Sequence, residues 1–296
     1  WNAYWKGEGK SNKLGWRLEY NMKNRGDVYA THGLGPVAQA LDIHRGDRMR
    51  TLIAMDTKSF NGKAEVEKVT GKECNEFRNG DHTTTLIRTE NGKVIEIQHD
   101  VLTPQPYNRL YQLTGTKGFA NKYPVEGYAI DSKQMAASGV QPKVDNLNTH
   151  SFLPKAEKDA LVAKYQHPIL KKYGEMAKEV GGHGGMDFIM DSRLVYCLQN
   201  GLPLDMDVYD MAEWCALAEL GALSMDNNYA SVAFPDFTRG HWNDVKGYKH
   251  AFASAEDEAE AERIAKEATA KMKEEGAKQW AKIAKQEAKA AKKNKK

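Results

Sequence analysis

A tyrosine and a histidine lie three residues apart in the segment GDVYATHGLGPV, residues 26–37. Histidine titrates near neutral pH and can take or deliver a proton, and a tyrosine hydroxyl can relay one. Tyr29 and His32 are therefore the pair to which we assign acid–base chemistry. The structural alternative is that His32 only caps a helix.

The residues after this pair indicate how it is held. Gly33, Gly35 and Pro36 are unsuited to the middle of a stable helix, but glycine fits a tight entry and proline is tolerated in a first turn. Apolar residues then follow at helical spacing. We predict that a loop meets the amino end of a helix here, that the helix runs to about residue 42, and that Tyr29 and His32 stay reachable at the junction.

Two further segments carry candidate site residues. Tyr107 stands in TPQPYNR, where two prolines fix the approach of a rigid loop; a strand-edge aromatic is the alternative. His183 and Asp187 stand in GGHGGMD, where the glycines let the backbone approach a ligand or another chain segment. Their i, i+4 spacing suits a metal, but no third ligand is evident. We predict substrate contact or a structural role for this cluster, and no metal site.

The pattern of elements predicts an α+β fold with a large, mostly antiparallel sheet covered on one face by helices. The clearest signal is the hairpin over residues 81–100, in which Asn91-Gly92 turns the chain between alternating strands. Strands at 109–115 and 117–123 are expected to continue the same sheet. Apolar residues at helical spacing predict helices over 156–172, 191–200 and 208–223, and a short helical turn is expected around 16–23.

Charge divides the chain into two parts. The formal net charge is +3, and the whole excess lies after residue 250, where 12 basic and 9 acidic residues alternate with alanine. We expect a domain over 1–250 and a solvated, charged helical tail over 251–296. The charge-neutral body lacks the basic face of a nucleic-acid-binding protein, and no apolar run reaches membrane-spanning length.

Five segments together resemble the C-terminal part of glycoside hydrolase family 109, the NAD-dependent α-N-acetylgalactosaminidases of the glucose–fructose oxidoreductase-like superfamily. The resemblance covers residues 16–246, and its motifs occur in the family's order. They are YATHGLGPVAQALDIHRGDRM (29–49), IQHDVLTPQPYNRLYQLTGTKG (97–118), GGHGGMDFIM (181–190), NGLPLDMDVYDMAEW (200–214) and SMDNNYASVAFPDFTRG (224–240).

This resemblance implies the substrate-side domain of a two-domain bacterial enzyme. The family's N-terminal Rossmann domain should precede this chain, and we find no G-x-G-x-x-G after a strand. Tyr29 and His32 match the family's second active-site pair, which also contacts NAD. Tyr107 is the best match to a third active-site tyrosine, with Tyr111 as the runner-up. The implied partner is a glycan with terminal N-acetylgalactosamine; a homo-oligomer and a periplasmic or secreted setting are further expectations.

The family mechanism oxidises C3 of the sugar, which acidifies the hydrogen on C2; elimination of the C1 substituent, addition of water and re-reduction complete a hydrolysis without net redox change. Histidine can serve as base for the C3 hydroxyl, and tyrosine can relay or donate a proton. The sequence leaves the division of roles between Tyr29 and His32 open. Two alternatives remain: an NAD(P)-dependent sugar oxidoreductase of the same superfamily, and a non-catalytic sugar-binding or interaction domain without its cofactor domain.

Overall fold

The computed structural model describes residues 14–140, 150–201, 204–247, 263, 270–271 and 274–286. The chain divides into two compact units, of which the first combines Trp1–Tyr165 with Val208–Lys246 and the second combines Gln166–Asp207 with Gly247–Lys296. The boundary expected at residue 250 lies outside the described residues. Within the expected tail, residues 274–286 are helical.

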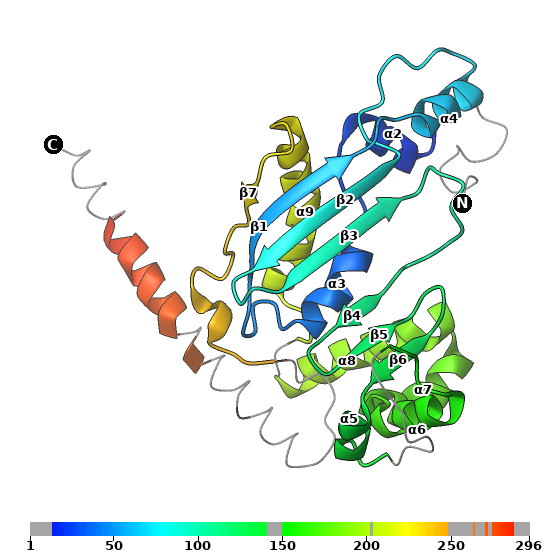
Figure 1. The fold of residues 1–296 in the computed structure, drawn as a ribbon. Coiled ribbons are helices and arrows are strands. Elements are labelled where there is room, and N and C mark those ends of the chain that lie inside the picture. The colour runs from blue at the N-terminus through cyan, green and yellow to red at the C-terminus, as the bar shows by residue number, and fades with distance from the viewer. Residues whose placement is uncertain are drawn as a thin grey trace. The chain divides into compact units, whose positions relative to one another are not determined.

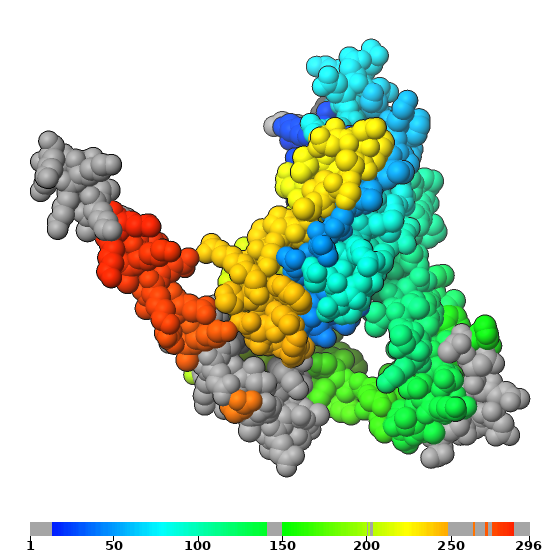
Figure 2. Space-filling model, turned by 60° about the vertical axis from the view of Figure 1, so that its left-hand side comes forward, coloured from blue at the N-terminus to red at the C-terminus, as the bar shows by residue number. Residues whose placement is uncertain are grey.

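A four-stranded antiparallel sheet is the centre of the first unit. Its order is β3-β2-β1-β7, formed by β1 (Met49–Asp56), β2 (His82–Thr89), β3 (Val94–Asp100) and the short β7 (Val232–Ala233). The predicted hairpin is confirmed, since β2 and β3 are joined by a tight turn in which Gly92 has a φ of 82°. In Figure 2 the yellow and orange residues before Lys246 lie against the blue and cyan strands.

Helices α3 (Thr31–Ala40) and α9 (Val208–Asp226) cover one face of this sheet (Figure 1). Side chains alternate along the strands, so that one set points toward the helices and the other away from them. The inward set packs with α3 and α9 into the main core, whose fully buried members include Leu34, Leu52, Ile87 and Leu217. The α+β class with helices on one sheet face is thus confirmed.

The helical turn expected around residues 16–23 is present as α2 (Trp16–Lys23). It packs against α4 (Asn61–Thr70) around a second apolar cluster of Leu18, Val66, Cys74 and Phe77. This cluster packs α2, which precedes β1 in the chain, against α4, which follows β1.

The expected single large sheet is wrong for the strands after residue 100. β4 (Gln112–Thr114), β5 (Gly118–Asn121) and β6 (Gly127–Ile130) form a separate three-stranded antiparallel sheet. Residues 101–111, which join β3 to β4, contain no strand. Pro104 and Pro106 lack the N–H groups that a central strand needs, which accounts for the break. Two helices follow in the first unit, α5 (Ser132–Ala137) and α6 (Lys155–Tyr165).

The second unit contains α7 (Pro168–Val180), the 3₁₀ turn η1 (His183–Gly185) and α8 (Met186–Asn200). The single helix expected over 156–172 is wrong, because α6 ends at Tyr165 and α7 begins at Pro168. Proline cannot donate to a preceding turn but suits the first helical position, which it occupies in α7. Among the described residues, no helix is both long enough and apolar enough to span a membrane.

Candidate active site

The Tyr29–His32 pair lies at the amino end of α3, as predicted, but the helix begins earlier than expected. It starts at Thr31 and contains Gly33, Gly35 and Pro36. The expectation that these residues only open a helix is therefore wrong. Packing explains Gly35, because a Cβ added there would lie 3.2 Å from the Trp214 ring of α9.

The two candidate rings stack on each other. The centroids of Tyr29 and His32 are 4.7 Å apart and the ring planes are inclined by 19°. Both side chains are exposed, and Tyr29 keeps 44% of its surface accessible. The stack holds the imidazole in place while leaving the hydroxyl and one ring face of the tyrosine open to a ligand.

The segment before β4 adds two tyrosines and an arginine to this pair. Tyr111 donates a hydrogen bond from its hydroxyl to the main-chain carbonyl oxygen of His32. Arg109 donates from Nε to the hydroxyl of Tyr107, and its guanidinium lies 5.7 Å from the centroid of that ring. The structure thus brings the runner-up tyrosine into direct contact with His32, whereas Tyr107 is connected through Arg109.

Electrostatics differ between the histidine and the tyrosine that contacts it. The pKa of His32 is lowered, first by burial of its ring atoms and then by the positive charge of Arg109. The pKa of Tyr111 is raised, mainly by burial. Near neutral pH, His32 is therefore a neutral imidazole that can accept a proton. Tyr111 stays protonated, and its hydroxyl donates the hydrogen bond to the carbonyl oxygen of His32.

A buried acidic group lies directly before the Tyr29 turn, and sequence reasoning missed it. The carboxylate of Asp27 is fully buried and accepts hydrogen bonds from the hydroxyls of Thr83 (2.5 Å) and Thr85 on β2. Burial raises the pKa of Asp27, while the hydrogen bonds from Thr83 and Thr85 oppose that shift. The inward positions of threonines 83 and 85 on an alternating strand were the sequence signal that could have revealed this partner.

The backbone at Gly26, directly before Asp27, is also held by specific contacts. The N–H of Gly26 donates to Asn79 Oδ1 at 2.9 Å, and Gly26 has a φ of 104°, which favours glycine. A Cβ at this position would lie 3.0 Å from the carbonyl oxygen of Ala218 in α9. The turn that presents Tyr29 and His32 therefore begins at a glycine that packs directly against the backbone of α9.

His183 and Asp187 belong to the second unit. His183 Nδ1 lies 2.9 Å from an oxygen of Asp187, and both side chains are exposed. Gly185 explains part of the glycine cluster, because a Cβ there would lie 2.6 Å from the backbone of Ala177 in α7. The close approach is thus made to another chain segment; substrate contact by His183 and Asp187 stays a prediction.

These features define an α+β domain that presents a stacked tyrosine–histidine pair at the amino end of a helix. The family model described as glycosyl hydrolase 109, C-terminal domain, matches residues 3–244. The chain therefore belongs to glycosyl hydrolase family 109, as the motif resemblance indicated, and it carries the C-terminal domain of that family.

Curated relatives agree with this assignment. "Glycosyl hydrolase family 109 protein 5" of Phocaeicola vulgatus is 80% identical over 272 residues, which cover 92% of this chain and 52% of the relative. Protein 3 of the same organism is 65% identical over 91% of the chain and 49% of the relative. Protein 1 of Bacteroides thetaiotaomicron is 59% identical over 86% and 52%. The chain thus spans about half the length of the curated relatives that it matches.

Proposed function

We propose that this chain forms the substrate side of an NAD-dependent glycosidase that removes terminal α-linked N-acetylgalactosamine. The observation that carries the proposal is the state of His32. Its imidazole is stacked on Tyr29, is exposed to a ligand and is kept neutral by a lowered pKa. A base poised in this way suits the removal of a proton from a sugar hydroxyl.

The residues present fit one end of the cofactor. Tyr29 and His32 form a flat, accessible surface, and aromatic faces of this kind stack on planar rings. They would contact the nicotinamide ring, and the bound cofactor would supply a hydride acceptor and donor for C3 of the sugar. His32 would take the proton of the C3 hydroxyl and return it when the hydride returns.

The other two tyrosines have separate tasks in this proposal. Tyr111 orients His32 through the main chain and keeps its own proton, so it serves as a positioning group. Tyr107 is exposed next to Arg109 and can hydrogen-bond a sugar hydroxyl. Tyr29, stacked on His32, then supplies the hydroxyl that can relay a proton to the departing C1 substituent or from C2.

The test is hydrolysis of 4-nitrophenyl α-N-acetylgalactosaminide by the NAD+-loaded protein, with nitrophenol and NADH followed together. We expect nitrophenol release without NADH build-up. His32→Gln should lower kcat by about 10²–10⁴-fold, as expected when a general base is lost. Tyr29→Phe should also lower kcat, whereas Lys68→Gln on the exposed side of α4 should not. NADH accumulating in step with turnover would instead identify a sugar oxidoreductase.

A further inference from the structure

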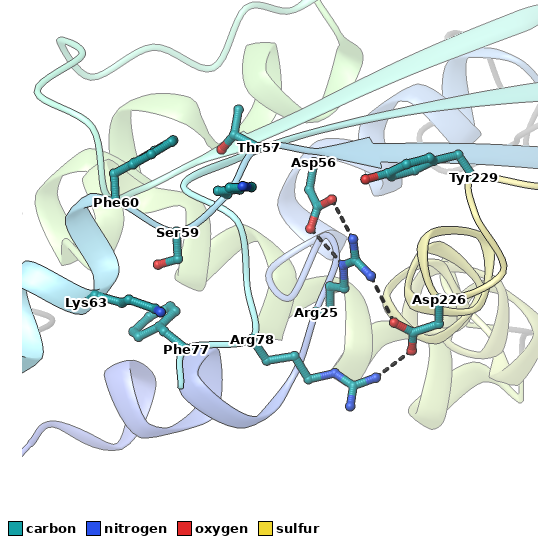
Figure 3. A pocket seen from close by; sticks show the side chains of 11 residues that line it. Arg25, Asp56, Thr57, Ser59, Phe60, Lys63, Phe77, Arg78, Asp226 and Tyr229 are labelled. Carbon is teal, nitrogen blue, oxygen red and sulfur yellow. Dashed lines mark hydrogen bonds and ion pairs between the residues drawn. The ribbon is translucent and has the colours of Figure 1, made fainter. Parts of the chain in front are cut away.

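A hollow of about 740 Å³ opens at the end of the four-stranded sheet where β1 leads into α4 (Figure 3). Its walls come from the segment after β1, the first turn of α4, residues 77–78 and the end of α9. None of the four residues Tyr29, His32, Tyr107 and Tyr111 lines it. The hollow is therefore a separate feature of the first unit.

Four charged side chains on one side of the hollow neutralise one another. Arg25 binds both carboxylate oxygens of Asp56 at 2.8 Å and donates to Asp226 at 3.0 Å. Arg78 binds the other oxygen of Asp226. The dashed contacts in Figure 3 form a linear series of ion pairs from Asp56 through Arg25 and Asp226 to Arg78. Because Asp56 raises the pKa of Arg25 further, this network stays charged, and its carboxylates are committed to arginine.

The remaining charges of the lining are both positive. Lys58 is exposed and has no hydrogen bond or ion pair within the described part of the chain. Lys63, in the first turn of α4, donates one hydrogen bond to the carbonyl oxygen of Asn75 and retains further N–H groups. The hollow thus carries a surplus of positive charge that no carboxylate of the described residues neutralises.

Neutral groups beside these lysines add two further features. Ser59 Oγ is buried and has no hydrogen-bond partner among the described residues. A buried hydroxyl without a partner is costly, so a ligand that pairs with it gains affinity. The next residue, Phe60, leaves 68% of its surface exposed at the hollow. An inorganic oxyanion would fill only part of such a space and would leave this apolar ring uncovered.

The backbone N–H groups at the start of α4 are already used. Both oxygens of Asp81 accept from them, with Phe60 N at 3.0 Å, Asn61 N at 2.8 Å and Gly62 N at 3.1 Å. A bound anion must therefore pair with side chains, and Lys58 and Lys63 are the cations available to it.

We propose that this hollow binds an anionic saccharide, a sugar ring that carries a sulfate or carboxylate group. Lys58 and Lys63 pair with the anionic group, the Ser59 hydroxyl bonds to a sugar oxygen, and Phe60 covers the apolar face of the ring. The site is a second, non-catalytic sugar site. It does not depend on the proposed function, because its test measures binding alone.

Calorimetric titrations of the purified chain at fixed ionic strength test this, with N-acetylgalactosamine 6-sulfate, N-acetylgalactosamine and sodium sulfate as probes. The sulfated sugar should bind at least about tenfold more tightly than either other probe. Lys58→Gln should weaken its binding by about fivefold, and Phe60→Ala should weaken it as well. The matched control Lys68→Gln removes the same charge from an exposed position on α4 outside the hollow and should change nothing.

Any one of four results would overturn the proposal. Sodium sulfate binding as tightly as the sulfated sugar would mean that only an anion is recognised. Equal losses in the Lys58 and Lys68 variants would leave only general electrostatic attraction. No binding of the sulfated sugar would show that the hollow is not a sugar site. His32→Gln should leave the affinity for the sulfated sugar unchanged; if it abolishes binding, the ligand occupies the candidate active site.

Discussion

The Tyr111 hydroxyl donates a hydrogen bond to the main-chain carbonyl oxygen of His32. In an uninterrupted helix this carbonyl would accept from the N–H of residue 36, but Pro36 has none. The sequence thus removes a hydrogen bond from the first turns of α3, and the fold replaces it with a side chain from the segment before β4. The candidate base and that segment are held together as a result.

Tyr111→Phe should therefore lower the free energy of unfolding by about 1 kcal/mol, since a carbonyl oxygen loses its partner. In a Pro36→Ala background, residue 36 supplies the missing N–H, and the same substitution should cost less. Urea unfolding of the four proteins in this double-mutant cycle measures the difference. Equal costs in both backgrounds would show that the two residues act independently; exposed Tyr165→Phe is the control.

The acid–base behaviour of His32 should depend on Arg109. Burial and then the Arg109 charge lower the pKa of His32, so folding favours the neutral imidazole. The resulting contribution to the free energy of unfolding is fully present above the pKa of the unfolded chain, about 6.5. It is lost as the pH falls through that value toward the lower pKa of the folded protein.

Arg109→Gln should raise the pKa of His32, and the activity of this variant should decline at a higher pH than that of the parent protein. An NMR titration of the His32 ring measures the shift directly. Because Arg109 is exposed, added salt should produce a smaller change in the same direction. Lys117→Gln removes another exposed cation and should leave the titration unchanged.

The buried carboxyl of Asp27 should require both of its threonine partners. Thr85→Val leaves one carboxylate oxygen without its donor and should destabilise the fold by about 1–3 kcal/mol; Thr83→Val should act similarly. Thr51→Val on the neighbouring strand removes a hydroxyl that has no hydrogen bond in the described structure and is the matched control. Thermal unfolding of the three variants compares them, and equal losses would contradict a specific role for the Asp27 contacts.

The sequence predicted the elements whose signals are local. The hairpin of β2 and β3 follows from Asn91-Gly92 between alternating strands, and α9 follows from sixteen residues with helical apolar spacing. The place of Tyr29 and His32 at a helix start was also predicted. Each of these depends on neighbours within a few residues, which is the range over which sequence patterns report structure.

The errors arose where distant contacts override local preference. Gly35 lies inside α3 because the Trp214 ring occupies the space that a side chain would fill. Pro36 is tolerated there because Tyr111 supplies the hydrogen bond that the proline cannot donate. The contact between Tyr111 and His32 joins residues 79 positions apart, so no local pattern could indicate it. The division of the sheet after residue 100 can, by contrast, be predicted from Pro104 and Pro106, which lack the N–H groups that strand pairing needs.

Whether the reaction passes through loss of the C2 proton is the most direct question for the proposed function. The measurement is hydrolysis of the N-acetylgalactosaminide in D2O by the NAD+-loaded protein, with the released sugar analysed by NMR. We expect deuterium at C2, because a base removes that proton before water adds at C1. Hydrolysis that leaves C2 fully protonated would contradict it and would point to direct displacement by two carboxylates.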